Sequence, residues 1–269
     1  MIRYLVAGVK HAIGLHRPGR RLPVRPDDIL LASYPESGNT WTRFLTANLI
    51  HPDGEVGLGN LHRLVLDPDV STKRDFDRAP QPRIIKSRSS FDPRYRRVIY
   101  VVRDPRDVAV SQYDSLRKAR RMDDVFRVEE FVERFLAGGD AVRRVSTDHF
   151  GSWGENVGSW LAARSGDPGF LLLRYEDMLA DTPHELTRVA TFVGLSTTIE
   201  RISQAIERSS TARLAQSNWR KDLPEPQVSR IEAEWGDIMA CLGYKLATRD
   251  SRSALDSSLI GLLASGALR

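Results

Sequence analysis

Cysteine and long apolar runs are what this sequence has least of. Cys241 is the single cysteine among 269 residues, which excludes an intramolecular disulfide and a cysteine-rich metal site. No apolar run is long enough to span a bilayer. Residues 1–21 have a broken apolar patch and lack the continuous core and cleavage site of a signal peptide. We therefore expect a cytoplasmic protein that does not enter a membrane.

The composition is that of a globular protein with a basic surface. Hydrophobic residues make up 41% of the chain, charged residues 28%, and the net charge is +5. We expect one domain over residues 1–269, with an N-terminal extension at 1–27 and a C-terminal tail at 249–269. The positive charge favours an anionic ligand or a nucleic acid. Aromatic residues are not interleaved with the basic clusters, so we expect no nucleic-acid partner. A homo-oligomer is left open.

Apolar runs and helical periodicity alternate along the chain. The expected strands are "DILLAS" (28–33), "RIIKS" (83–87), "RVIYVV" (97–102) and "FLLLRY" (170–175). The expected helices are 40–50, 104–120 and 181–194. Strands alternating with helices predict an α/β fold of three layers around a central, mainly parallel sheet. Residues 51–80 and 138–150 are interpreted as long loops where an acceptor would bind.

The stretch "SYPESGNTW" (33–41) lies between the first strand and the first helix. Such a turn aims backbone N–H groups and the positive end of the helix dipole at one point, where an anion binds. Gly38 allows close approach of the backbone, and Ser37, Asn39 and Thr40 add side-chain donors. Asn39 replaces the lysine of a triphosphate-binding loop, so a smaller anion than magnesium-bound triphosphate is expected. An ordinary turn and helix cap remains the alternative.

A second motif, "VIYVVRDPRDVAVS", places Arg103 at the end of a buried strand and Ser111 eight residues later in a helix. The carboxyl ends of strands are where α/β sheets bind ligands. A guanidinium at this place is suited to grip a phosphate through two hydrogen bonds. The alternative is that Arg103 only pairs with Asp104 or Asp107.

These motifs resemble those of the cytosolic-type sulfotransferases, and we expect a bacterial member of that family. "YPESGNTW" is similar to their Y-P-K-S-G-T/N-T-W loop, and "RDPRDVAVS" to their second motif. The resemblance continues through "RIIKS", "GSWGENVGSW", "LLLRYEDML" and "HELTRVATFVGL", and it fades around "SNWRKDLPEPQ". It covers roughly residues 28–245, with several motifs in the same order.

The resemblance implies a P-loop-NTPase-like sulfotransferase fold and the sulfuryl donor 3′-phosphoadenylyl sulfate (PAPS). The product would be 3′-phosphoadenosine 5′-phosphate (PAP), and no metal is expected. The implied nucleotide-binding residues are Ser37, Gly38, Asn39 and Thr40 for the phosphosulfate, Trp41 and Tyr175 for adenine, and Arg103, Ser111 and Arg213 for the 3′-phosphate.

Two positions depart from the family at the reacting centre. Glu36 stands where the family has a loop lysine, and Arg88 where it has a catalytic histidine. Arginine stays protonated and cannot act as a base. Because the two changes have opposite charge, we expect Glu36 and Arg88 to face each other as an ion pair, with Glu36 as a candidate base. Lys86 remains available to stabilise the sulfuryl oxygens.

The sequence therefore predicts a PAPS-dependent sulfotransferase acting on a hydroxyl or amine of a small molecule. The predicted catalytic residues are Lys86, Arg88 and Glu36. A noncatalytic PAP-binding protein of the same fold is the second interpretation, because Glu36 and Arg88 replace catalytic residues. A nucleotide kinase is the third, and Asn39 disfavours it.

Overall fold

The computed structural model describes residues 22–118, 127–138, 150–210 and 218–248. A parallel sheet of four strands lies at the centre of this part of the chain, in the order β2-β1-β3-β4. The strands are β1 (Ile29–Ser33), β2 (Ile84–Ser87), β3 (Arg97–Val102) and β4 (Phe170–Arg174). The predicted strands and their parallel direction are confirmed.

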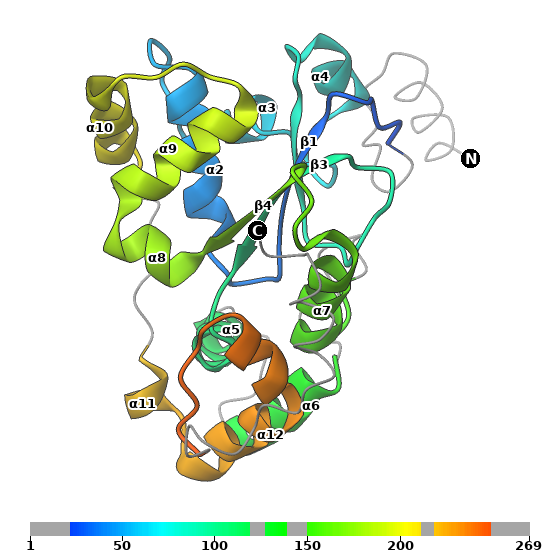
Figure 1. Cartoon of the computed structure of the whole chain (residues 1–269), viewed down its shortest axis with the longest axis vertical. Coiled ribbons are helices and arrows are strands. Elements are labelled where there is room, and N and C mark those ends of the chain that lie inside the picture. Colours follow the sequence, from blue (N-terminus) through cyan, green and yellow to red (C-terminus); the bar gives the residue numbers. More distant parts are fainter. Residues whose placement is uncertain (1–21, 119–126, 139–149, 211–217, 249–269) are drawn as a thin grey trace.

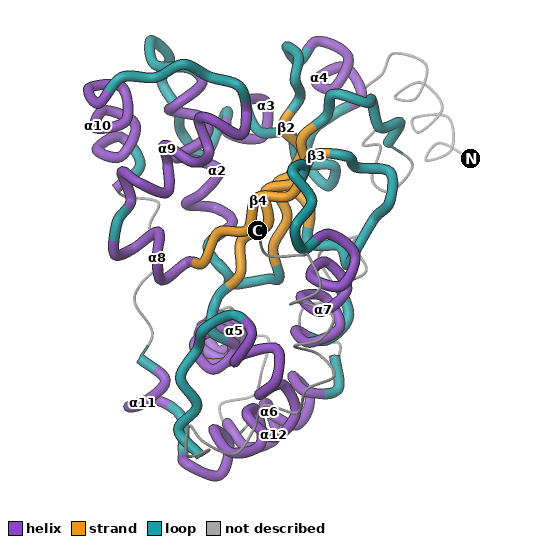
Figure 2. The backbone as a smooth tube through the Cα atoms, in the orientation of Figure 1, coloured by secondary structure: helices purple, strands orange, loops and turns teal. Residues whose placement is uncertain are grey.

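Helices pack around the sheet (Figures 1 and 2). Those preceding β4 are α2 (Asn39–Ile50), α3 (Leu61–Leu64), α4 (Lys73–Arg78), α5 (Pro105–Lys118), α6 (Val128–Leu136) and α7 (Trp153–Arg164). Those following it are α8 (Tyr175–Ala180), α9 (Thr182–Val193), α10 (Ile199–Arg208), α11 (Trp219–Asp222) and α12 (Glu225–Cys241). The three helices expected from the sequence correspond to α2, α5 and α9. The Asp181 side chain caps α9, and Gly194 ends it with φ 83°.

Two hydrophobic clusters cover the two faces of the sheet. Leu30 and Ala32 of β1 belong to the cluster built with α5, α6, α7 and α12. Their neighbours Ile29 and Leu31 belong to the cluster built with α2, α8, α9 and α10. Successive residues of a strand point to opposite faces, so a strand buried on both sides reads as one apolar run. The predicted three-layer α/β fold is confirmed.

The strand order reverses at β1. The chain leaves β1 for β2 on one side and then crosses to β3 on the other side. Open α/β sheets bind ligands at this switch point, outside the carboxyl ends of the strands. The loop after β1 and Arg103 after β3 both lie there. The topology therefore brings together the two motifs singled out in the sequence.

Some expectations differ from the structure. Residues 51–80 are not one loop, because α3 and α4 lie within them, and α4 begins with a capping box formed by Thr72 and Asp75. Tyr175 opens α8 instead of ending β4. Most of the expected loop at 138–150 lies outside the described residues, as do the C-terminal tail and residues 1–21. None of the helices described is long and apolar enough to cross a membrane.

Candidate functional site

The loop after β1 is held tightly against the start of α8. Gly38 has φ 95°, a conformation that favours glycine. A Cβ added to Gly38 would lie 2.4 Å from Cδ2 of Tyr175. The Tyr175 ring in turn meets the Trp41 ring edge-on, with centroids 5.9 Å apart. Gly38 is thus required both by the backbone conformation and by the packing beneath the loop.

Ser37 carries a buried hydroxyl group at the turn into α2. The residue is 0% exposed. Among the residues that the structure describes, its Oγ has no hydrogen-bond partner. Buried polar groups are normally paired, and an orphaned one needs an explanation. A ligand oxygen at the N-terminus of α2 would supply the missing partner.

Arg103 joins the end of β3 to this loop. Its guanidinium donates to the backbone oxygen of Glu36 at 2.9 Å and lies 4.8 Å from the centroid of the Tyr175 ring. The backbone oxygen of Arg103 accepts a hydrogen bond from Nε1 of Trp153. The residue is 2% exposed. Its charge is therefore fixed in place, which suits it to recognise an anion without prior reorganisation.

Ser111 reaches the same loop from α5. Its hydroxyl donates to Oε2 of Glu36 at 2.9 Å. Arg103 and Ser111 therefore both contact Glu36, and they lie close together as the resemblance of the second motif implied. The ion pair expected between Glu36 and Arg88 stays a prediction; the structure shows the Glu36 carboxylate accepting a hydrogen bond from Ser111. The positive φ of Glu36 accompanies this direction of its side chain toward α5.

Lys86 lies at the end of β2 in a buried cluster of charges. Its Nζ lies 3.0 Å from Oδ2 of Asp67, and the guanidinium of Arg43 lies 3.7 Å from the same oxygen. Leu66 pairs with Ile85 beside β2, and this places Asp67 next to Lys86. Burial lowers the pKa of Arg43, Asp67 opposes that change, and the nearby positive charge of Arg88 adds to it. Two cations, Lys86 and Arg43, thus share the Asp67 carboxylate, and the charge of Arg88 lies near enough to act on Arg43.

Helix α7 holds the segment that carries Arg88. The side chain of Asn156 donates to the backbone oxygen of Arg88 and accepts from the Tyr100 hydroxyl at 2.7 Å. Nε1 of Trp160 donates to the backbone oxygen of Ser89 at 3.0 Å. Asn156 and Trp160 are fully buried. The "GENVGSW" motif therefore positions the chain that follows Lys86.

Trp41 and Tyr175 are 3% and 1% exposed, within the cluster on the α2 side of the sheet. In the described structure their rings pack against each other, and Tyr175 packs against Gly38 of the loop after β1. Thr40 is exposed at the first turn of α2, and the amide of Asn39 points back to the oxygen of Leu31 at 3.5 Å. Arg213, expected at the 3′-phosphate, lies outside the described residues.

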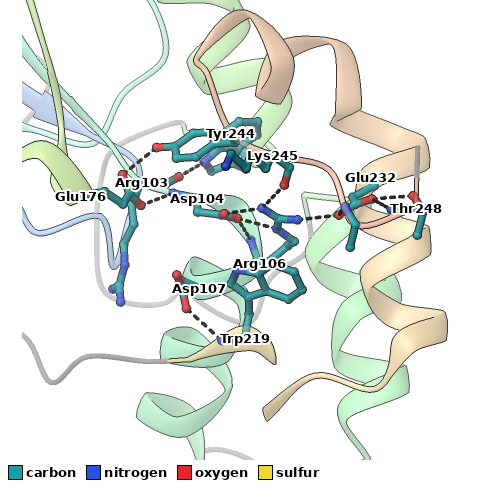
Figure 3. A network of polar contacts seen from close by, with 12 residues as sticks. Arg103, Asp104, Arg106, Asp107, Glu176, Trp219, Glu232, Tyr244, Lys245 and Thr248 are labelled. Atoms are coloured by element: carbon teal, nitrogen blue, oxygen red, sulfur yellow. Dashed lines mark hydrogen bonds and ion pairs between the residues drawn. The ribbon is translucent and has the colours of Figure 1, made fainter. Parts of the chain in front are cut away.

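A second network joins the "RDPRD" motif to the C-terminal helix (Figure 3). Arg106 is bound by Asp104 at 2.6 Å and by Glu232 of α12 at 2.5 Å. Its guanidinium carbon lies 3.9 Å from the ring centroid of Trp219. The N–H of Trp219 donates to Asp107 at 3.1 Å. The "SNWRKDLPEPQ" region is thereby attached to α5 through Arg106.

Two carboxylates of this network have shifted pKa values of opposite direction. Burial raises the pKa of Glu176, whose oxygens accept from the N–H of Asp104 and the hydroxyl of Tyr244. Burial alone would also raise the pKa of Glu232. Hydrogen bonds from Ala247 and Thr248 and the charge of Arg106 outweigh burial, so the pKa of Glu232 is lowered. The ion pair with Arg106 therefore persists as the pH falls to the usual glutamate range.

Asp67 and Asn156 are the site residues that the sequence analysis missed. Asp67 lies within the stretch interpreted as a loop, and the only signal for it was an acidic residue ahead of the β2 lysine. Asn156 is a polar residue on α7 between Trp153 and Trp160, and all three are buried. A buried amide on such a helix signals a required hydrogen-bond partner.

Comparison with known proteins agrees with this arrangement. The model of the sulfotransferase domain family matches residues 26–234. Sulfotransferase 1A1 of Bos taurus is 29% identical over 202 residues, and that of Canis lupus familiaris is 30% identical over 203 residues. Each match covers 69% of this chain and 65% of the relative, so the chain matches slightly less than two thirds of the length of these relatives.

Two solved structures show the same fold at low sequence identity. Mouse sulfotransferase SULT7A1, complexed with PAP, superposes with a TM-score of 0.62 at 21% identity, over 86% of this chain and 92% of that one. Retinol dehydratase, in complex with androsterone and PAP, superposes with a TM-score of 0.59 at 21% identity, over 88% and 86% of the two chains. By the match of the family model to most of its length, the chain belongs to the sulfotransferase domain family.

Proposed function

We propose that this protein transfers the sulfuryl group of PAPS to a hydroxyl or amine of a small-molecule acceptor. The observation that carries the proposal is the meeting of three donor groups at the end of β1. These are the orphaned Ser37 hydroxyl, the fixed Arg103 guanidinium and the Ser111 hydroxyl. The N-terminus of α2 adds backbone N–H groups and a positive dipole end. This set fits an anionic nucleotide.

The loop after β1 and helix α5 bind different phosphate groups of the nucleotide. Residues 37–40 and the start of α2 hold the 5′-phosphosulfate, and Arg103 with Ser111 holds the 3′-phosphate. Trp41 and Tyr175 support the loop on the adenine side. The contact of Arg213 with the 3′-phosphate stays a prediction. The cytoplasmic location, the single domain, the bacterial source and a homo-oligomer also stay predictions.

Lys86 and Arg88 act on the transferred group. The acceptor oxygen or nitrogen forms a bond to sulfur, and the bond from sulfur to the bridging oxygen of the phosphate breaks. The electron pair of that bond leaves with PAP, and the acceptor's proton passes to solvent. The positive charge of the cluster around Asp67 stabilises the charge that spreads over the sulfuryl oxygens. Glu36 is bound to Ser111 and therefore lies beside the residues that hold the nucleotide.

The direct test is a transfer assay with labelled PAPS against phenols, alcohols and amines. We expect label to appear on at least one acceptor class. Binding of PAP without any transfer would instead support a noncatalytic PAP-binding protein, which the replacement of the family's lysine and histidine by Glu36 and Arg88 favours. Calorimetry with PAP, PAPS and ATP–Mg completes the test. Tightest binding of ATP–Mg would contradict the sulfotransferase proposal and support a kinase.

Lys86→Met is expected to lower the transfer rate by about 100-fold, because it removes one positive charge from the sulfuryl oxygens. PAP affinity should stay within about threefold, since β2 and β3 lie on opposite sides of β1. Steady-state kinetics and calorimetry measure the two quantities. Lys73→Met, an exposed lysine of α4, is the matched control. An equal loss of rate and PAP affinity would place Lys86 in nucleotide binding.

Arg103→Ala is expected to weaken PAP binding by about 1.5–3 kcal/mol, the usual cost of a hydrogen bond to a charged group. Binding of adenosine 5′-phosphate should change far less, because that nucleotide has no 3′-phosphate. Calorimetry with both nucleotides checks this, with the exposed Arg96→Ala as control. Equal losses for the two nucleotides would mean that Arg103 supports the loop and does not recognise the 3′-phosphate.

A further inference from the structure

Glu36 is the residue at which the loop and α5 are joined. Its backbone oxygen accepts from Arg103, and its carboxylate accepts from the Ser111 hydroxyl, both at 2.9 Å. Its φ is 63°, and it is the only residue other than glycine with a positive φ in the described part of the chain. Residues with a side chain rarely adopt this conformation. The hydrogen bond from Arg103 therefore holds the backbone of Glu36, and the one from Ser111 holds its carboxylate.

The Ser111 hydroxyl has one hydrogen to donate, and Glu36 takes it. A phosphate oxygen that binds Ser111 must replace the carboxylate as acceptor. If the carboxylate stays nearby, two negative charges lie together in a half-buried site, where screening by water is reduced. The single charge of Arg103, which donates to the backbone oxygen of Glu36, offsets only part of the repulsion between a carboxylate and a phosphate dianion.

We infer that Glu36 is a specificity-determining residue that competes with the 3′-phosphate of the nucleotide for Ser111. This inference rests on the proposed function and deepens it. The carboxylate lowers affinity for the 3′,5′-bisphosphate while leaving the 5′-phosphate contacts of residues 37–40 unchanged. The chain therefore distinguishes PAP from adenosine 5′-phosphate less sharply than its donor set would allow. PAP, the product, also dissociates more readily.

The test compares Glu36→Gln with the unchanged protein by calorimetry, using PAP and adenosine 5′-phosphate. Glutamine keeps the shape and an acceptor oxygen for Ser111 but removes the charge. We expect PAP to bind about 10- to 100-fold more tightly, as relief of a like-charge contact should give. Adenosine 5′-phosphate should change by less than about threefold. Glu207→Gln, an exposed change of the same charge on α10, should alter neither affinity.

A second variant, Glu36→Gly, removes the carboxylate and suits the positive φ, so it should shift PAP affinity in the same direction. In Ser111→Ala, the added change Glu36→Gln should have a smaller effect on PAP than it has alone, which a double-mutant cycle measures. This coupling separates competition at Ser111 from a general gain in positive charge.

The outcomes are distinct. Unchanged or weakened PAP binding in both Glu36 variants, with PAP still bound by the unchanged protein, overturns the inference and leaves the proposed function standing. Equal tightening for both nucleotides also overturns it, because the carboxylate would then act on the 5′-phosphate. Absence of PAP binding in every variant overturns the proposed function together with the inference.

Discussion

Gly38→Val is expected to abolish nucleotide binding, with PAP affinity falling by more than about 1,000-fold, equivalent to roughly 4 kcal/mol. The new Cβ would lie 2.4 Å from the Tyr175 ring, and the residue would have to keep φ at 95°. Valine is stiff and strongly disfavours that conformation. The loop must therefore move, and its backbone N–H groups no longer point at the bound anion. Calorimetry with PAP measures the loss.

Gly194 provides a matched control for backbone strain. It ends α9 with φ 83°, and a Cβ there would meet nothing within 4 Å. Gly194→Ala and Gly38→Ala share the conformational penalty, but only the change at Gly38 presses on Tyr175. We expect PAP binding to be kept in the first and lost in the second. Retained PAP affinity in Gly38→Val would mean that the anion binds elsewhere.

The fold follows from local patterns that the sequence shows directly. Each of the four strands was identified from an apolar run; β1, β2 and β3 are almost wholly buried on both faces, which leaves no polar alternation, whereas β4 is partly buried. The limits of α9 followed from Asp181 and Gly194, which are helix-capping residues. Helices α3 and α4 were missed because they are short and lie in a stretch rich in glycine, aspartate and proline.

Only the part of the candidate site that lies within the recognised sequence motifs could be predicted from the sequence. The resemblance implied that Arg103 and Ser111 act together, and the structure brings both to Glu36 at the edge of the sheet where strands end. The hydrogen bond between Ser111 and Glu36 was not foreseen, because the charge of a residue says nothing about the backbone angle that sets the direction of its side chain. Asp67 reaches Lys86 through an isolated bridge beside β2, a contact that no local sequence pattern reports.

The ion pairs of Arg106 include a further long-range contact, and they bear on the stability of the domain. Arg106 is 2% exposed and bound to two buried carboxylates, Asp104 and Glu232. Glu232 also accepts hydrogen bonds from the N–H groups of Ala247 and Thr248. One guanidinium therefore joins the end of β3, helix α12 and the segment after it (Figure 3). This polar contact adds to the apolar packing of α12 in the cluster that it shares with α5, α6 and α7.

Arg106→Ala is expected to lower the free energy of unfolding by about 3–5 kcal/mol, because it leaves two buried carboxylates without their cation. That is a large part of the roughly 5–15 kcal/mol that stabilises a typical domain. The change also removes the cation from the Trp219 ring. Urea denaturation measures the loss, and Lys118→Ala, an exposed residue at the end of α5, should change stability by less than about 0.5 kcal/mol.

The pH dependence separates lost charge pairing from lost packing. The pKa of Glu232 is lowered in the folded protein, so its pairing contributes stability above the ordinary pKa of 4.5. That contribution is lost as the pH falls through the folded pKa. The deficit of Arg106→Ala should therefore shrink in acid, and Arg106→Lys, which keeps the charge but not the fork, should show a smaller deficit at neutral pH. A deficit that stays constant from neutral to acid pH would show that Arg106 stabilises the domain by packing on Trp219 alone.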